Sequence, residues 1–187
     1  MAHKEEKRPP MQTSEETKER HLEMSKAQGE AYEEALMEMI NHMAQGGGVK
    51  RRGDYLIGYA LEKAEGMWQP QEYGELIWQE PEDENLHIEV VVRDGADGRF
   101  IPGLVVQVTL LNSQNRDVGK HRHYFIWHPW LYHYGRNWKV DEAGTYTLKV
   151  HIEPPEWSRH DKKNGKRYAQ EVDVTFENVK IEDLGQK

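Results

Sequence analysis

Four of the ten histidines of this 187-residue chain lie between His121 and Trp138, among closely spaced aromatic side chains. The stretch has neither a glycine-rich phosphate loop nor a Ser/His/Asp arrangement, and the whole chain has no cysteine. Imidazoles held among aromatic rings are typical of a stiff, partly dry pocket that binds a polar or metallic ligand. Without thiolates, metal ligands must come from imidazole, carboxylate or thioether groups. The stretch therefore indicates metal binding rather than catalysis.

A second candidate lies earlier in the chain, where His87 and Glu89 stand two residues apart in an alternating apolar segment, 86–93. Side chains two apart on a β-strand point to the same side, so this pair is expected to face away from the apolar core. An imidazole and a carboxylate on a rigid strand supply half of a first-row metal site. The alternative is an ordinary solvated polar face, and the pair alone favours that alternative.

Four further side chains are candidate ligands. His133 is expected in a loop after Pro129, where the alternative is a ring packed between tyrosines. His160 lies in a charged turn, where a histidine is more often simply hydrated. His128 would end a strand next to Pro129 and so lie close to the loop of His133. Met67 offers a soft sulfur, although most methionines serve in packing.

The composition limits the class of partner. A net charge of −8 and a pI of about 5.7 argue against nucleic acid and favour cations or basic protein surfaces. No apolar run approaches the ~20 residues that cross a bilayer, so direct membrane insertion is not expected. The first ten residues are charged and polar rather than a signal peptide, which predicts either a cytosolic protein or one whose leader has been removed.

The chain is expected to divide at residue 52. Residues 1–52 read as a charged arm to about residue 20, an amphipathic helix over 14–45 and a glycine hinge at 46–48. Residues 53–187 are expected to form the metal-binding domain. The helical stripe consists of Ala31, Leu36, Met39, Ile40 and Met43.

Within 53–187, seven short alternating segments separated by turns predict an all-β fold, an immunoglobulin-like antiparallel β-sandwich with the helix as an N-terminal extension. The spacing Asp-x-x-Gly-x-Tyr that ends at Tyr146 is typical of a tyrosine corner in such sandwiches. The expected strands are 55–61, 74–78, 86–93, 104–111, 121–127, 145–152 and 168–178.

Four motifs occur in a characteristic order: His-Ile-Glu at 87–89, His-Tyr-Gly-Arg-Asn at 133–137, Gly-Thr-Tyr-Thr-Leu leading to Ile-Glu-Pro-Pro across 144–155, and Arg-His-Asp at 159–161 before Gly165 and Arg-Tyr at 167–168. Together they resemble the periplasmic iron-transport proteins, a family that includes the treponemal 34 kDa lipoprotein antigen and relatives in Campylobacter and Escherichia. The resemblance covers roughly residues 53–180.

The resemblance implies an immunoglobulin-like domain that dimerises and binds a divalent metal near the dimer interface. The ligands of the family match His87, Glu89, His133 and His160. Three imidazoles and one carboxylate form a borderline donor set that favours copper and also accepts iron, zinc or manganese, so the expected metal is copper or iron. Binding requires neutral imidazole, so occupancy is expected to fall as the pH drops through about 6.5.

The sequence departs from the family at one expected ligand. The family places a methionine shortly before the loop histidine, and this chain has Ile126 there. Loss of the thioether makes the site harder and less suited to Cu(I), unless His128 or Met67 takes its place.

The resemblance therefore implies a periplasmic, non-enzymatic metal-binding accessory to high-affinity iron uptake, which acts as a homodimer and exchanges iron with a membrane permease. The main alternative is a binding module whose aromatic loop, between 127 and 138, holds a sugar or a peptide. A metalloenzyme is a further alternative, for which Glu89 is the one evident general base. Separately, the segment 14–45 is a candidate docking helix for a partner or a second protomer.

Overall fold

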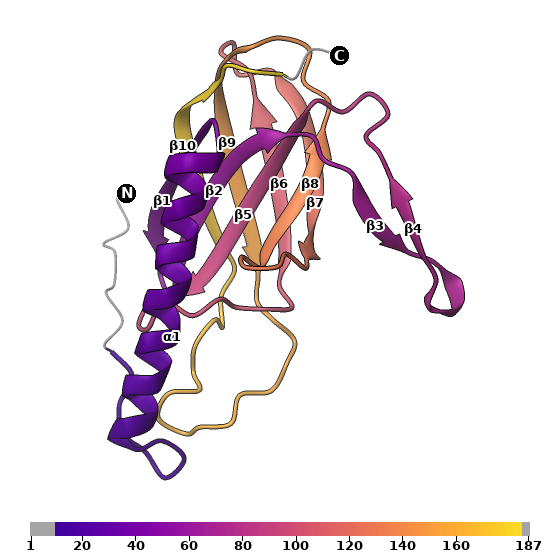
Figure 1. Ribbon diagram of the computed structural model, residues 1–187. Coiled ribbons are helices and arrows are strands. Elements are labelled where there is room, and N and C mark those ends of the chain that lie inside the picture. The colour runs from indigo at the N-terminus through magenta and orange to yellow at the C-terminus, as the bar shows by residue number, and fades with distance from the viewer. Residues whose placement is uncertain (1–9, 185–187) are drawn as a thin grey trace.

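The computed structural model describes residues 10–184, in which an all-β domain carries one N-terminal helix (Figure 1). Eight strands form a continuous antiparallel sheet in the order β1-β2-β5-β8-β7-β6-β9-β10. The sheet folds over at β7, which pairs with β6 through residues 117–123 and with β8 through residues 124–126. The strands are β1 (Gly46–Arg52), β2 (Tyr55–Lys63), β5 (Leu86–Asp94), β6 (Val105–Leu111), β7 (Asp117–Ile126), β8 (His133–Trp138), β9 (Gly144–Glu153) and β10 (Val172–Ile181).

The two layers enclose one apolar core, as the alternating pattern predicts. Leu86, Ile88 and Val90 of β5 are fully buried on its inner side. The Tyr146 hydroxyl donates a hydrogen bond to the backbone carbonyl of Glu142, which is the predicted tyrosine corner. The predicted all-β sandwich with a helical extension is therefore confirmed.

The helix α1 (Glu19–Glu38), followed by a π-helical turn (Met39–Met43), packs on the outer face of the sheet rather than standing apart from it. Its approach is close at Gly29, because a Cβ there would lie 1.7 Å from the carbonyl oxygen of Asp97. Only glycine permits this contact without a backbone shift. The apolar cluster under the helix consists of Leu36, Met39, Ala60, Val91 and Leu131.

Two expectations for the N-terminal region are wrong. The glycines at 46–48 do not form a hinge after the helix: they begin β1 and pair with residues 59–61 of β2, where the crowded Ile40 and Tyr59 leave no room for a side chain on Gly47. The predicted trailing arm is tied down in its described part, because the Ser14 hydroxyl donates to Asp161. Residues 1–9 of that arm lie outside the described residues.

A separate two-stranded hairpin projects from the body between β2 and β5 (Figure 1). It consists of β3 (Met67–Pro70) and β4 (Leu76–Gln79), joined by a turn that includes a short 3-10 helix, Glu72–Gly74. We call residues 64–85 the arm. Among the described helices, none combines the length and the apolar character that a membrane span requires.

Candidate metal centre

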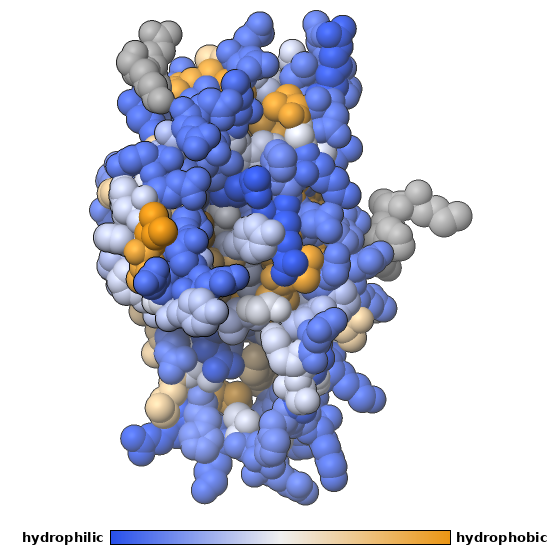
Figure 2. Space-filling view, turned by 90° about the vertical axis from the view of Figure 1, so that its right-hand side faces the viewer, coloured by the Kyte–Doolittle hydropathy of each residue, from blue (hydrophilic) through white to orange (hydrophobic). Residues whose placement is uncertain are grey.

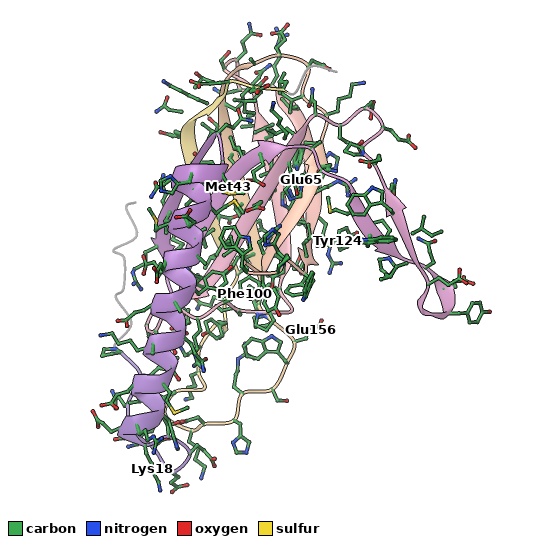
Figure 3. All side chains as sticks on the ribbon, in the orientation of Figure 1. Lys18, Met43, Glu65, Phe100, Tyr124 and Glu156 are labelled. Carbon is green, nitrogen blue, oxygen red and sulfur yellow. The ribbon has the colours of Figure 1, made fainter. Side chains whose placement is uncertain are left out.

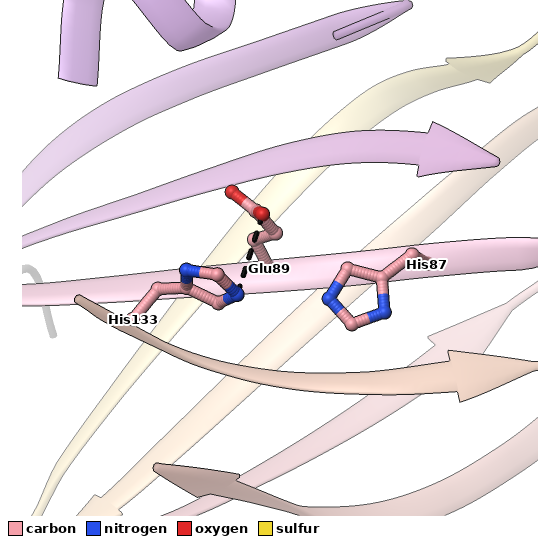
Figure 4. Close-up of side chains that lie close together, drawn as sticks. All are labelled: His87, Glu89 and His133. Atoms are coloured by element: carbon pink, nitrogen blue, oxygen red, sulfur yellow. Dashed lines mark ion pairs between the residues drawn. The ribbon is translucent and has the colours of Figure 1, made fainter. Parts of the chain in front are cut away.

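Two neighbouring strands bring three candidate ligands together on the outer face of the sheet (Figure 4). His87 and Glu89 come from β5, and His133 is the first residue of β8 rather than part of a loop. The register of β5 and β8 places Glu89 opposite Gly135. One potential ligand atom from each of the three side chains lies within 4.8 Å of the others. Ligands about 2.1 Å from one ion stand at most about 4.2 Å apart, so this spacing is close to what an ion imposes.

The three side chains are buried, although the sequence favoured a solvated face. His87, Glu89 and His133 are each 2% exposed. Helix α1 accounts for part of this burial, because it covers the outer face of β5 at Val91, two residues after Glu89. A polar cluster shielded to this degree requires partners for each of its donors and acceptors.

Hydrogen bonds orient both imidazoles. The Nδ1–H of His133 donates to the carbonyl of Leu131, at 2.9 Å. His87 Nδ1 lies 2.8 Å from Asn137 Oδ1, and Asn137 Nδ2 in turn donates to the carbonyl of Glu65, which fixes Oδ1 as an acceptor. Each ring therefore keeps its proton on Nδ1 and leaves the lone pair of Nε2 free. Such outer partners are the usual means by which a protein prepares histidine as a metal ligand.

The carboxyl group of Glu89 completes the cluster and has few partners of its own. Its Oε1 lies 3.3 Å from His133 Nε2, and its Oε2 is buried without a hydrogen-bond partner. A buried carboxylate oxygen left in this way costs free energy unless a cation or a proton satisfies it. The donor set of two imidazole nitrogens and a carboxylate suits a divalent transition metal.

Burial sets the charge states of the group. It raises the pKa of Glu89 to about 8, and the nearby carboxylates of Glu62 and Glu65 add to this shift. It lowers the pKa of His133 to about 4 and also lowers the pKa of His87. Both imidazoles are therefore predominantly neutral at neutral pH, and Glu89, rather than histidine, is the group from which a metal would displace a proton there.

A small residue opposite Glu89 leaves room for a ligand. A Cβ on Gly135 would lie 2.7 Å from His87 Nε2 and 2.7 Å from Ile126 Cδ1. Ile126 pairs with His133 across β7 and β8, so it supplies an apolar wall at the position where the resemblance implied a methionine. Glu62 and Glu65 line a surface pocket of about 370 Å³ on another side of the cluster. The site is thus apolar on one side and acidic on the other.

The remaining candidates lie outside this group of three. His128 is close, since its ring centroid is 6.0 Å from that of His133. His160 is on the loop between β9 and β10, where its side chain is 89% exposed and lies 3.4 Å from Glu16. Met67 begins β3 in the arm and is half-buried. Within one chain, then, the structure brings together His87, Glu89 and His133, with His128 alongside.

Three positions that contribute to the site were not identified from the sequence. Asn137 orients His87, Gly135 makes room, and Glu65 both anchors Asn137 and adds negative charge. The signal for Gly135 and Asn137 was β8 itself, in which His133, Gly135 and Asn137 alternate with larger side chains on the other face. Glu65 lies outside β8 and had no such signal.

Residues 39–182, more than three quarters of the chain, match the family described as Fe2+ transport protein. The chain belongs to this family. A search of curated protein sequences found no match. The helix α1 precedes the matched region, whereas both strands that carry the candidate ligands lie within it.

Solved structures share the fold. A copper-bound variant of FetP from uropathogenic Escherichia coli aligns with a TM-score of 0.59 and 23% identity, over 74% of this chain and 94% of that chain. A copper-bound variant of P19 from Campylobacter jejuni aligns with a TM-score of 0.58 and 17% identity, over 74% and 99% of the two chains. FetP as isolated after expression in the Escherichia coli periplasm aligns with a TM-score of 0.57 and 22% identity, over 72% and 95%.

Proposed function

We propose that this member of the Fe2+ transport protein family binds a divalent transition metal, copper or iron, through His87, Glu89 and His133, as an accessory to high-affinity iron uptake. One observation carries the proposal: two oriented Nε2 lone pairs and an unpartnered carboxylate oxygen converge in a buried cluster. The family match and the copper-bound structural neighbours support the same chemistry.

Three protein ligands leave room for a fourth, and two histidines are available. His128 is near enough to reach the site with a modest movement of its loop. His160 is almost fully exposed, and we assign it to the site of a second protomer in a homodimer rather than to that of its own chain. Met67 is a weaker candidate because it lies in the arm. Zinc and manganese also suit this donor set.

We assign the protein a carrier role in the periplasm, where it would exchange iron with a membrane permease. A carrier must release its cargo, and a carboxyl group whose pKa is about 8 supports release because a proton competes with the metal near neutral pH. The acidic pocket formed in part by Glu62 and Glu65 would attract cations to the site. This role requires no general acid or nucleophile, and we propose none.

Thermal unfolding of untagged protein, with and without Cu(II), Zn(II) or anaerobic Fe(II), tests the proposal. Metal should raise the melting temperature of the wild type and of the control His42→Ala/His151→Ala, whose histidines lie in ion pairs elsewhere on the surface. It should leave that of His87→Ala/His133→Ala unchanged, because only a ligand bound to the folded state stabilises it. An equal rise in all three proteins would overturn the assignment.

A further inference from the structure

The arm exposes several large apolar side chains. Its register places Trp68 opposite Trp78 and Pro70 opposite Leu76, so these four side chains share one face. All four are exposed, and the two indole rings meet edge to face with centroids 5.5 Å apart. Within the described residues, β3 and β4 pair only with each other. An isolated two-stranded hairpin is at best marginally stable in water, so a partner on this face would stabilise it.

The arm also concentrates negative charge. Residues 64–85 contain seven acidic residues and no basic one, while the net charge of the whole chain is −8. Two of these, Glu72 and Glu75, lie on the projecting hairpin itself, and the other five lie on the segments that join it to the body. A partner for the arm must combine basic groups with an apolar or aromatic surface.

The outer face of β7 has this combination. Lys120, Arg122 and Tyr124 follow one another on that face, and the Arg122 guanidinium lies 5.3 Å from the centre of the Tyr124 ring. Tyr124 lies on the side of the body from which the arm projects (Figure 3), and orange and pale residues interrupt the blue surface on that side (Figure 2). Beyond the end of β7, the segment that leads to β8 carries further exposed aromatic residues, namely Trp127, Trp130 and Tyr132.

We propose that the arm docks on a second copy of this chain, with its Trp68/Leu76/Trp78 face against the basic and aromatic face of β7. Charge complementarity between two surfaces of the same chain selects this occupant. A two-fold arrangement satisfies both contacts at once, because each protomer offers one arm and one β7 face. The proposal rests on the homodimer of the proposed function and not on its metal site.

The docking gives the aromatic residues after β7 a role in assembly. Large aromatic side chains and arginine are the residues that most often dominate protein–protein interfaces. Arg122 and Tyr124 from one protomer and Trp68 and Trp78 from the other fit that description. The acidic rim of the arm would then set the register through contacts with Lys120 and Arg122.

Charge reversal tests the contact. We compare the full chain with an arm variant, Glu72→Lys/Glu75→Lys, and a strand variant, Lys120→Glu/Arg122→Glu, by sedimentation velocity at low salt. Wild type should dimerise, and each variant alone should be monomeric because like charges then face each other. An equimolar mixture should regain the dimer, since the reversed arm meets the reversed strand and the native arm meets the native strand. A monomeric wild type, dimeric single variants or a monomeric mixture would each refute the docking.

A matched pair of substitutions identifies the docking face. Leu76 is 59% exposed on the tryptophan face, and Ile77 is 54% exposed on the opposite face. Leu76→Ser should raise the dimer dissociation constant about tenfold, whereas Ile77→Ser should leave it nearly unchanged. Equal effects would refute the choice of face. The metal-dependent rise in melting temperature should persist in all these variants, so loss of the dimer and failure of the metal site remain distinguishable.

Discussion

Two buried carboxyl groups on β5, those of Glu89 and Asp94, have opposite surroundings. Asp94 accepts hydrogen bonds from Arg167 Nε at 3.0 Å and Arg167 Nη2 at 3.1 Å, and also from the Tyr168 hydroxyl. Glu89 has one oxygen 3.3 Å from an imidazole nitrogen and the other without a partner. The carboxyl group of Asp94 has its hydrogen-bond partners within the protein, as a structural group should, whereas that of Glu89 has an oxygen still open to a ligand.

The two groups also differ in their charged neighbours. Asp94 has the guanidinium of Arg167 beside it. In the part of the chain that the structure describes, the charged groups that act on Glu89 are the carboxylates Glu62 and Glu65, which raise its pKa further. Negative charge gathered around a buried carboxyl, next to two neutral imidazoles, favours a divalent cation over any side chain of the protein.

The largest expected effect is on the free energy of unfolding, which should fall on substitution of Asp94 and hardly change on substitution of Glu89. Asp94→Ala leaves Arg167 buried without its partner and should lower the free energy of unfolding by about 3–5 kcal/mol. Glu89→Gln should change the stability of the metal-free protein by less than about 1 kcal/mol, because the carboxyl is already protonated at neutral pH. Urea unfolding of both variants measures this. Similar losses from the two substitutions would contradict the distinction.

Gly135→Ala should affect the metal site and little else. The added methyl group would lie 2.7 Å from His87 Nε2, so the imidazole must move away from the ion. We expect metal affinity to fall about 100-fold. This is the upper end of the losses that follow when a residue next to a metal ligand is substituted. Isothermal titration calorimetry measures the affinity, and Gly144→Ala, at a strand position with its nearest neighbour 3.8 Å away, is the control. Undiminished affinity in Gly135→Ala would place the ion elsewhere.

The pH dependence of binding follows from the raised pKa of Glu89, about 8. Below that pH the folded protein holds a proton that the metal must displace, so affinity should rise about tenfold per pH unit between pH 6 and pH 8 and level off above. His133, with a pKa lowered to about 4, adds no second proton in this range. Titrations across the range should give a slope near one proton for wild type and near zero for Glu89→Gln. A slope of two, or a midpoint near 6.5, would show that histidine protonation controls binding.

The smallest expected effect concerns the orientation of His87. Asn137→Ala removes the acceptor of the His87 Nδ1–H bond and should lower metal affinity about tenfold. Asn137→Asp keeps an oxygen acceptor and should retain most of the affinity. Equal metal affinities of the two variants, measured by calorimetry, would contradict the orienting role of Asn137.

The sequence predicted the fold and the shared side of His87 and Glu89, because both depend on the period-two alternation of β-strands. Residues 86–93 correctly placed His87 and Glu89 on one side of a strand, opposite the core. The sequence did not predict that these two side chains are buried. Helix α1 covers the outer face of the sheet, but it was expected to stand apart from the sheet on a glycine hinge. The contact between Gly29 and Asp97 that docks this helix is non-local and has no local pattern.

His133 was a candidate ligand from the sequence, but it was expected in a loop. Pro129 before it and Gly135 after it are typical of turns, yet residues 133–138 form the strand next to β5. Pairing between strands more than forty residues apart is what brings His133 to Glu89, and a single sequence does not encode that register in any local signal. The metal-ligand roles of all six candidates remain predictions, namely His87, Glu89, His133, His128, His160 and Met67.

Anomalous X-ray diffraction from crystals of the untagged, metal-loaded protein tests the central claim most directly. Data collected on both sides of the absorption edge of the metal should give one strong peak per protomer, at bonding distance from Nε2 of His87, Nε2 of His133 and the Glu89 carboxylate. A strong peak elsewhere with none between these three side chains, or no peak at all in crystals whose solution was saturated with metal, would contradict the account.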